Sequence, residues 1–134
     1  MSLERILIID DEDDIREVAS LTLEEAGFEV LTAASGPEGI ERAAAERPDA
    51  ILLDVMMPGM DGPATLAGLR GNDATRTIPV IFLTAKIQAA DRRHLSALGP
   101  VAIMAKPFDP DRLGRDIADA LGWKRAHNEG EFFS

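Results

Sequence analysis

The feature that most constrains this chain is a strict alternation of short apolar runs with segments of helical periodicity. Five runs have the length and apolar content of strands, at residues 3–10, 28–32, 50–54, 79–84 and 101–105. Each run is followed within a few residues by a helix-like stretch. Apolar strands in strict alternation with helices require a parallel sheet covered by helices on both faces. The sequence therefore predicts an α/β fold with a five-stranded, doubly wound sheet.

Capping and helix-breaking residues mark the predicted helices, which are expected near residues 15–26, 36–46, 62–70, 87–98 and 110–121. Either Asp13 or Asp14 can cap the first helix, and Gly27 ends it where a C′ glycine would lie. The caps expected for the second, third and fifth helices are Ser35, Asp61 and Asp109.

The composition bounds the class of protein. A chain of 134 residues, 46% of them hydrophobic, is large enough for one core, so a single domain over residues 1–122 is expected. Residues 123–134 carry no periodic pattern and are expected to form a disordered tail, a linker or a cloning remnant. The absence of cysteine excludes disulfides, thiolate metal sites and cysteine nucleophiles.

The charge balance and the lack of targeting signals limit the partners. A formal net charge of −10 and a pI near 4.6 argue against direct binding to nucleic acid or anionic lipid, both of which attract cations. No run is apolar over the length of a membrane span, and the first residues do not have a signal-peptide layout. We therefore expect a cytoplasmic protein without membrane insertion.

Polar side chains follow four of the five predicted strands. Asp10 and Asp11 come after the first strand. Asp54 ends the third strand, Thr84 ends the fourth and Lys106 follows the fifth. Because the carboxyl ends of parallel strands meet at one edge of a sheet, these side chains are expected to lie together where α/β proteins bind ligands. Three carboxylates in one place repel unless a cation compensates their charge, and the candidates are a divalent metal and the lysine ammonium.

Oxygen ligands without histidine or cysteine favour a hard cation. A site of two or three protein oxygens with room for waters suits Mg²⁺ better than Ca²⁺, and Mn²⁺ is an expected substitute. Mg²⁺ held in this way commonly accompanies phosphoryl groups, whose oxygens Thr84 and Lys106 would contact. Transfer of a phosphoryl group to the carboxylate of Asp54 needs mainly positioning and charge neutralisation, which this set of residues would supply.

Four motifs resemble those of the receiver domains of two-component response regulators, particularly the stand-alone chemotaxis type. They are Ile8-Ile9-Asp10-Asp11-Glu12, Leu53-Asp54-Val55-Met56-Met57-Pro58-Gly59-Met60-Asp61-Gly62, Leu83-Thr84-Ala85 and Ala105-Lys106-Pro107-Phe108. Each motif alone is modest, but four in the family's order and spacing, covering residues 5–121, make a specific signal. The resemblance implies a flavodoxin-like (βα)5 sandwich with strand order 2-1-3-4-5.

The resemblance also implies a magnesium-dependent phosphoacceptor site. Asp54 would be the phosphoacceptor and would also contact the metal. Asp11 would be the direct acidic Mg²⁺ ligand, and Asp10 would act mainly through a metal-bound water. The backbone carbonyl of Met56 would complete the protein's share of the ligands.

The resemblance implies the remaining parts of a signalling switch. Thr84 and Lys106 would bind the phosphoryl oxygens, and the bond between Lys106 and Pro107 would be cis. A histidine kinase or a histidine phosphotransfer protein would donate the phosphoryl group, and the added charge would switch a surface that binds a downstream protein. The domain would be a monomer or a weak dimer. It would act as a phosphoacceptor and not as an enzyme that turns over a substrate.

Two places depart from the family pattern. The family usually has tyrosine or phenylalanine three residues before the lysine, where this chain has Ile103. We therefore expect the surface around the fourth helix and fifth strand to respond weakly to phosphorylation. Residues 98–101, with the sequence Leu-Gly-Pro-Val, stand where one large DNA-binding class has an aspartate pair. This difference argues against dimerisation in the manner of that class.

Two alternatives stay open at the level of sequence. A phosphatase of the haloacid-dehalogenase type also uses a strand-end aspartate and Mg²⁺, but it would need a second acid two residues later, where this chain has Met56. A receiver-like module that binds partners without being phosphorylated would not need the intact set of acidic, threonine and lysine residues. Multiple turnover of a phosphomonoester would favour the phosphatase.

Overall fold

The computed structural model describes residues 3–85 and 88–123. In this part of the chain, strands and helices alternate as the apolar runs predict. The strands are β1 (Arg5–Ile9), β2 (Glu29–Ala33), β3 (Ala50–Asp54), β4 (Val80–Thr84) and β5 (Ala102–Ala105). The helices are α1 (Asp13–Glu25), α2 (Gly36–Glu46), α3 (Gly62–Arg70), α4 (Ala89–Ser96) and α5 (Pro110–Leu121).

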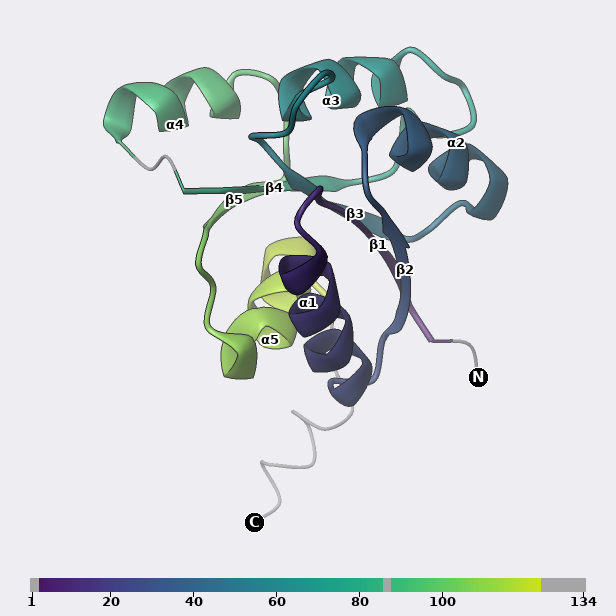
Figure 1. Ribbon diagram of the computed structural model, residues 1–134, viewed down its shortest axis with the longest axis vertical. Helices are drawn as coiled ribbons and strands as arrows, with labels where there is room; N and C mark the ends of the chain where they lie inside the picture. The colour runs from purple at the N-terminus through teal and green to yellow at the C-terminus, as the bar shows by residue number, and fades with distance from the viewer. Residues whose placement is uncertain (1–2, 86–87, 124–134) are drawn as a thin grey trace.

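The five strands form one parallel sheet in the order β2-β1-β3-β4-β5, which confirms the predicted topology. Figure 1 shows α1 and α5 on one face of the sheet and α2, α3 and α4 on the other. The sheet is therefore the middle layer of a three-layer sandwich. None of the helices in the described residues is long and apolar enough to cross a membrane.

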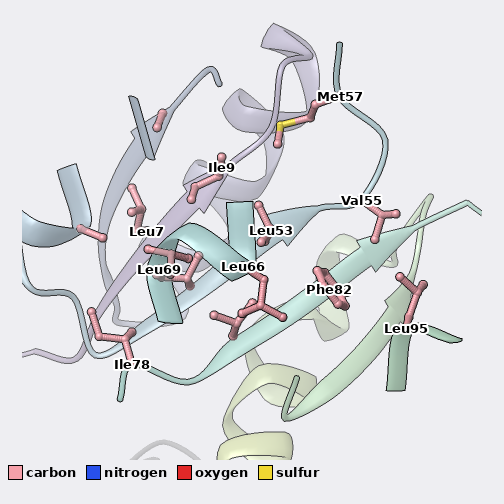
Figure 2. Packing of buried hydrophobic residues seen from close by; sticks show 14 residues of the cluster. Leu7, Ile9, Leu53, Val55, Met57, Leu66, Leu69, Ile78, Phe82 and Leu95 are labelled. Atoms are coloured by element: carbon pink, nitrogen blue, oxygen red, sulfur yellow. The ribbon is translucent and has the colours of Figure 1, made fainter. Parts of the chain in front are cut away.

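The sheet separates two apolar layers, and β1 contributes to both. Leu7 and Ile9 belong to the layer shown in Figure 2, together with side chains from α2, α3 and α4. Ile6 and Ile8 belong to the layer that includes side chains of α1 and α5. Successive side chains of a strand point to opposite faces, and here both faces are buried. This double burial explains why the strand reads as a continuous apolar run.

The helix starts match the prediction in three cases and differ in one. Three predicted caps are confirmed, each accepting a backbone N–H hydrogen bond from the first turn of its helix: Ser35, Asp61 and Asp109. The prediction for α1 is wrong. Asp13 and Asp14 lie inside the first turn, and the N-cap is Glu12, whose side chain does not cap the helix. That side chain instead accepts a hydrogen bond from Lys106, which follows β5.

Helix α4 is shorter than predicted, and the residue that follows α5 and its turn contacts the domain. The predicted helix over residues 87–98 is shorter, because α4 has one buried side chain, Leu95, to hold it against the sheet; residue 87 lies outside the described residues. After α5, Trp123 packs on Phe28, with ring centroids 5.9 Å apart. The rest of the predicted tail, residues 124–134, lies outside the described part of the chain.

Candidate functional site

The carboxyl ends of four strands bring the predicted site residues to one edge of the sheet. Asp10 follows β1, Asp54 and Thr84 end β3 and β4, and Lys106 follows β5. In the strand register, Asp54 lies beside Leu83 and Thr84 lies beside Ala105. Asp10 and Asp54 are only 1% and 2% exposed, and Thr84 is fully buried. Parallel topology therefore places two buried carboxylates and a buried hydroxyl at neighbouring strand ends.

The ammonium of Lys106 binds three carboxylates at this edge. Its Nζ lies 2.7 Å from Glu12 Oε1, 3.1 Å from Asp10 Oδ2 and 3.3 Å from Asp54 Oδ2. The backbone N–H of Lys106 donates to the carbonyl of Thr84 at 2.9 Å, which ties the end of β5 to β4. The peptide bond between Lys106 and Pro107 is cis, which confirms that prediction.

Hydrogen bonds fix the loop that carries Asp10. Its Oδ1 accepts the backbone N–H of Glu12 at 2.9 Å, so the turn after β1 is closed by the same side chain that faces Lys106. From α1, the guanidinium of Arg16 donates to the backbone carbonyl of Asp10 at 2.7 Å. One hydrogen bond therefore holds the Asp10 carboxylate and the other holds its backbone, which together fix the residue at the end of β1.

Asp54 has an incompletely satisfied carboxylate. Its Oδ1 accepts the backbone N–H of Met56 at 3.3 Å. Its Oδ2 is buried and has no hydrogen-bond partner among the described residues, although the Lys106 ammonium lies nearby as an ion-pair partner. Burial, together with repulsion from Asp10, raises the pKa of Asp54 to about 6, against the opposing attraction of Lys106. The carboxylate is therefore ionised at neutral pH but is poorly stabilised.

Lys106 is the compensating cation of the site. Burial alone would lower the pKa of its ammonium, but the hydrogen bonds to Glu12 and Asp10 outweigh burial, and the net pKa is raised above its usual value. The ammonium therefore stays charged at neutral pH. One positive charge faces three carboxylates, so the group keeps an excess of negative charge that a further cation would relieve.

The residues fit a hard divalent cation. Asp10, Glu12 and Asp54 each offer one carboxylate oxygen, and these three oxygens lie within 4.8 Å of one another. An all-oxygen donor set and the orphaned Oδ2 of Asp54 suit Mg²⁺. The predicted direct ligand, Asp11, is half-buried and is not a member of this group. The predicted role of the Met56 carbonyl stays a prediction.

Glu12 is the site residue that was not predicted from the sequence. It follows Asp11 in the acidic run, and no role of its own was predicted for it, since Asp13 or Asp14 was expected to cap the helix. Its contact with Lys106 joins positions 94 residues apart, so the local sequence carries no signal for it. The available signal was indirect: Glu12 belongs to an acidic run that was expected to lie near Lys106 at the edge of the sheet.

Comparisons with known proteins agree with this geometry. The family model for the response regulator receiver domain matches residues 6–118. The alkaline phosphatase synthesis transcriptional regulatory protein PhoP of Bacillus subtilis is 38% identical over 117 residues, which are 87% of this chain and 48% of PhoP. The chain thus spans about half the length of the first such regulators it matches.

Smaller proteins match over most of their length. Protein PilG of Pseudomonas aeruginosa is 33% identical over 123 residues, which are 92% of this chain and 86% of PilG. The chemotaxis protein CheY4 of Vibrio cholerae has a TM-score of 0.83 at 32% sequence identity, covering 89% of this chain and 99% of CheY4. With the sheet order and the strand-end site described above, these matches show that the chain belongs to the receiver domain family of two-component response regulators.

Proposed function

We propose that this receiver accepts a phosphoryl group on Asp54 and thereby switches a surface that binds a downstream protein. The observation that carries the proposal is the state of the Asp54 carboxylate. It is 2% exposed, its Oδ2 has no hydrogen-bond partner among the described residues, and a lysine ammonium lies 3.3 Å away. A carboxylate that is charged but poorly satisfied is suited to act as a nucleophile beside a fixed cation.

The residues around Asp54 would each support the transfer. An oxygen of Asp54 attacks the phosphorus as the bond from phosphorus to the donor breaks, and the ammonium of Lys106 neutralises the oxygens of the moving group. Thr84, at the end of β4, would bind another of these oxygens. Asp10, Asp11, Asp54 and the carbonyl of Met56 are the proposed ligands of Mg²⁺, with Mn²⁺ as a substitute. Bound Mg²⁺ would add charge neutralisation to the transfer.

The proposed donor is the phosphohistidine of a histidine kinase or of a histidine phosphotransfer protein, or a small phosphodonor. The family match supports this choice over a phosphatase of the haloacid-dehalogenase type. Met56 stands where such a phosphatase would need its second acid. The chain is proposed to take up one phosphoryl group for each signalling event and not to turn over a phosphomonoester.

The test is phosphorylation by acetyl phosphate with Mg²⁺, followed by Phos-tag electrophoresis. We expect a labile adduct on the natural chain and none on Asp54→Asn. Asp61→Asn is a matched control, because it makes the same substitution in the loop after β3 and asparagine can also cap α3. An adduct that is undiminished in Asp54→Asn would reject the assignment, and multiple turnover of p-nitrophenyl phosphate would favour the phosphatase.

A further inference from the structure

The Lys106 ammonium is bound most closely by a carboxylate that was not expected in the site. The distance from Nζ to Glu12 Oε1 is 2.7 Å, shorter than the distances to Asp10 and Asp54. The contacts with Glu12 and Asp10 are hydrogen bonds, whereas the contact with Asp54 is an ion pair whose buried Oδ2 receives no hydrogen bond. The two hydrogen bonds found for the ammonium therefore both run to the loop after β1, and its contact with the proposed phosphoacceptor is the longest of the three.

Glu12 occupies a position that normally has another task. It is the N-cap of α1, where a side chain usually accepts a hydrogen bond from the first turn, and it makes no such bond. Its carboxylate is used on Lys106 instead. The side chain of Glu12 is 58% exposed, whereas that of Asp10 is 1% exposed. Of the two hydrogen-bond partners of Lys106, Glu12 is the one that can move into water at low cost.

We propose that Glu12 is a positioning residue that holds the Lys106 ammonium on the loop after β1, and that it is displaced when a phosphoryl group occupies Asp54. This inference rests on the proposed phosphorylation of Asp54. A phosphoryl group carries more negative charge than a carboxylate and offers several acceptor oxygens. Lys106 can keep its hydrogen bond to the buried Asp10 while its ammonium turns toward the phosphoryl group, and this movement breaks the contact with the exposed Glu12. Glu12 thereby sets how strongly the site holds that group.

The expected size of the effect follows from the exposure of Glu12. Ion pairs with one well-exposed partner contribute little, so removing this competitor should tighten the binding of a phosphoryl group by about two- to five-fold. A variant that only damages the loop would change the binding in the opposite direction. The sign of the change therefore separates a competing partner from a residue that merely supports the fold.

Equilibrium binding of beryllofluoride, a phosphoryl mimic, tests the proposal at Mg²⁺ concentrations that saturate each variant. Glu12→Ala removes the carboxylate, and Glu12→Asp keeps its charge but shortens its reach. An aspartate can also cap α1. We expect both variants to bind the mimic about two- to five-fold more tightly than the natural chain. Glu17→Ala, at an exposed position one turn further along α1, is expected to leave the affinity unchanged.

Each other outcome overturns the proposal. Unchanged or weaker binding in both Glu12 variants would show that Glu12 does not compete for Lys106. Tighter binding in Glu12→Ala alone would assign the effect to net charge and not to the contact. If the mimic does not bind to the natural chain or to any variant, or if its binding does not depend on Asp54, the proposed function fails together with this inference. Thermal unfolding of every variant confirms that each one is folded.

Discussion

Replacing the proposed phosphoacceptor is expected to stabilise the protein. Asp54→Asn keeps the size and shape of the side chain but removes a charge that burial and the neighbouring Asp10 disfavour. The net effect of the surroundings already includes the attraction of Lys106, and it still raises the pKa of Asp54. In the absence of Mg²⁺, the folded state therefore favours an uncharged side chain at this position.

The magnitude follows from the pKa of Asp54, which rises from the ordinary value of 3.8 to about 6. Each pH unit of difference corresponds to about 1.4 kcal/mol, so the ionised carboxylate costs about 3 kcal/mol of folding free energy. A raised pKa in an acid means that the folded protein binds its proton more tightly than the unfolded chain. The cost is therefore absent in acid, develops as the pH rises from about 4 to 6, and is constant above about 7.

Urea denaturation in EDTA, followed by circular dichroism, measures this cost. At pH 8 we expect Asp54→Asn to exceed the natural chain by about 3 kcal/mol in unfolding free energy, and at pH 4 by less than about 1 kcal/mol. Asp14→Asn, at an exposed position of α1, is the control and should show no comparable pH-dependent gain. A loss of stability in Asp54→Asn at pH 8, or a gain of the same size at both pH values, would refute the reasoning.

Three further predictions concern the site and its surroundings. Mg²⁺ at 100 times its dissociation constant should raise the unfolding free energy by about 2.7 kcal/mol. At the same Mg²⁺ concentration, Asp10→Asn should show a smaller increase, and an increase equal to that of the natural chain would contradict the metal site. Gly62→Ala should destabilise the fold by roughly 1–3 kcal/mol, because an added Cβ would lie 2.7 Å from the Asp54 carbonyl oxygen. Gly71→Ala, with its nearest contact at 3.4 Å, is the control in the same urea titration, and equal losses would refute the steric argument. Because Ile103 replaces the usual ring, beryllofluoride should change amide exchange little over residues 88–105, and strong protection there would contradict this expectation.

The sheet could be predicted from sequence because its strands are buried on both faces. A continuous apolar run leaves little choice of boundary, and β3 begins and ends where the run does. Helix α2 was equally predictable, since Ser35 caps its start and Pro48 follows its C-cap, Arg47. Helix α4 was less predictable, because its sequence pattern is weak. Among the described residues of this helix, Leu95 alone is buried.

The candidate site was predictable where topology determines it. Asp54, Thr84 and Lys106 end or follow parallel strands, so the strand order alone brings them together. The loop after β1 has no such periodicity. Asp10 turns inward, and the next acid to reach the group is Glu12, because a lysine from the far end of the chain attracts it. A contact of that sequence separation cannot be inferred from an acidic run alone.

The span of the Lys106 contacts has a consequence for protein synthesis. Lys106 meets Asp10 across 96 residues, and β5, which precedes it, is an edge strand of the sheet. A chain emerging from the ribosome exposes its acidic loop and Asp54 well before this ammonium has been made. Buried carboxylates without their cation resist compaction. The nascent chain should therefore complete this edge of the sheet, and become able to accept the proposed phosphoryl group, only after Lys106 has been translated.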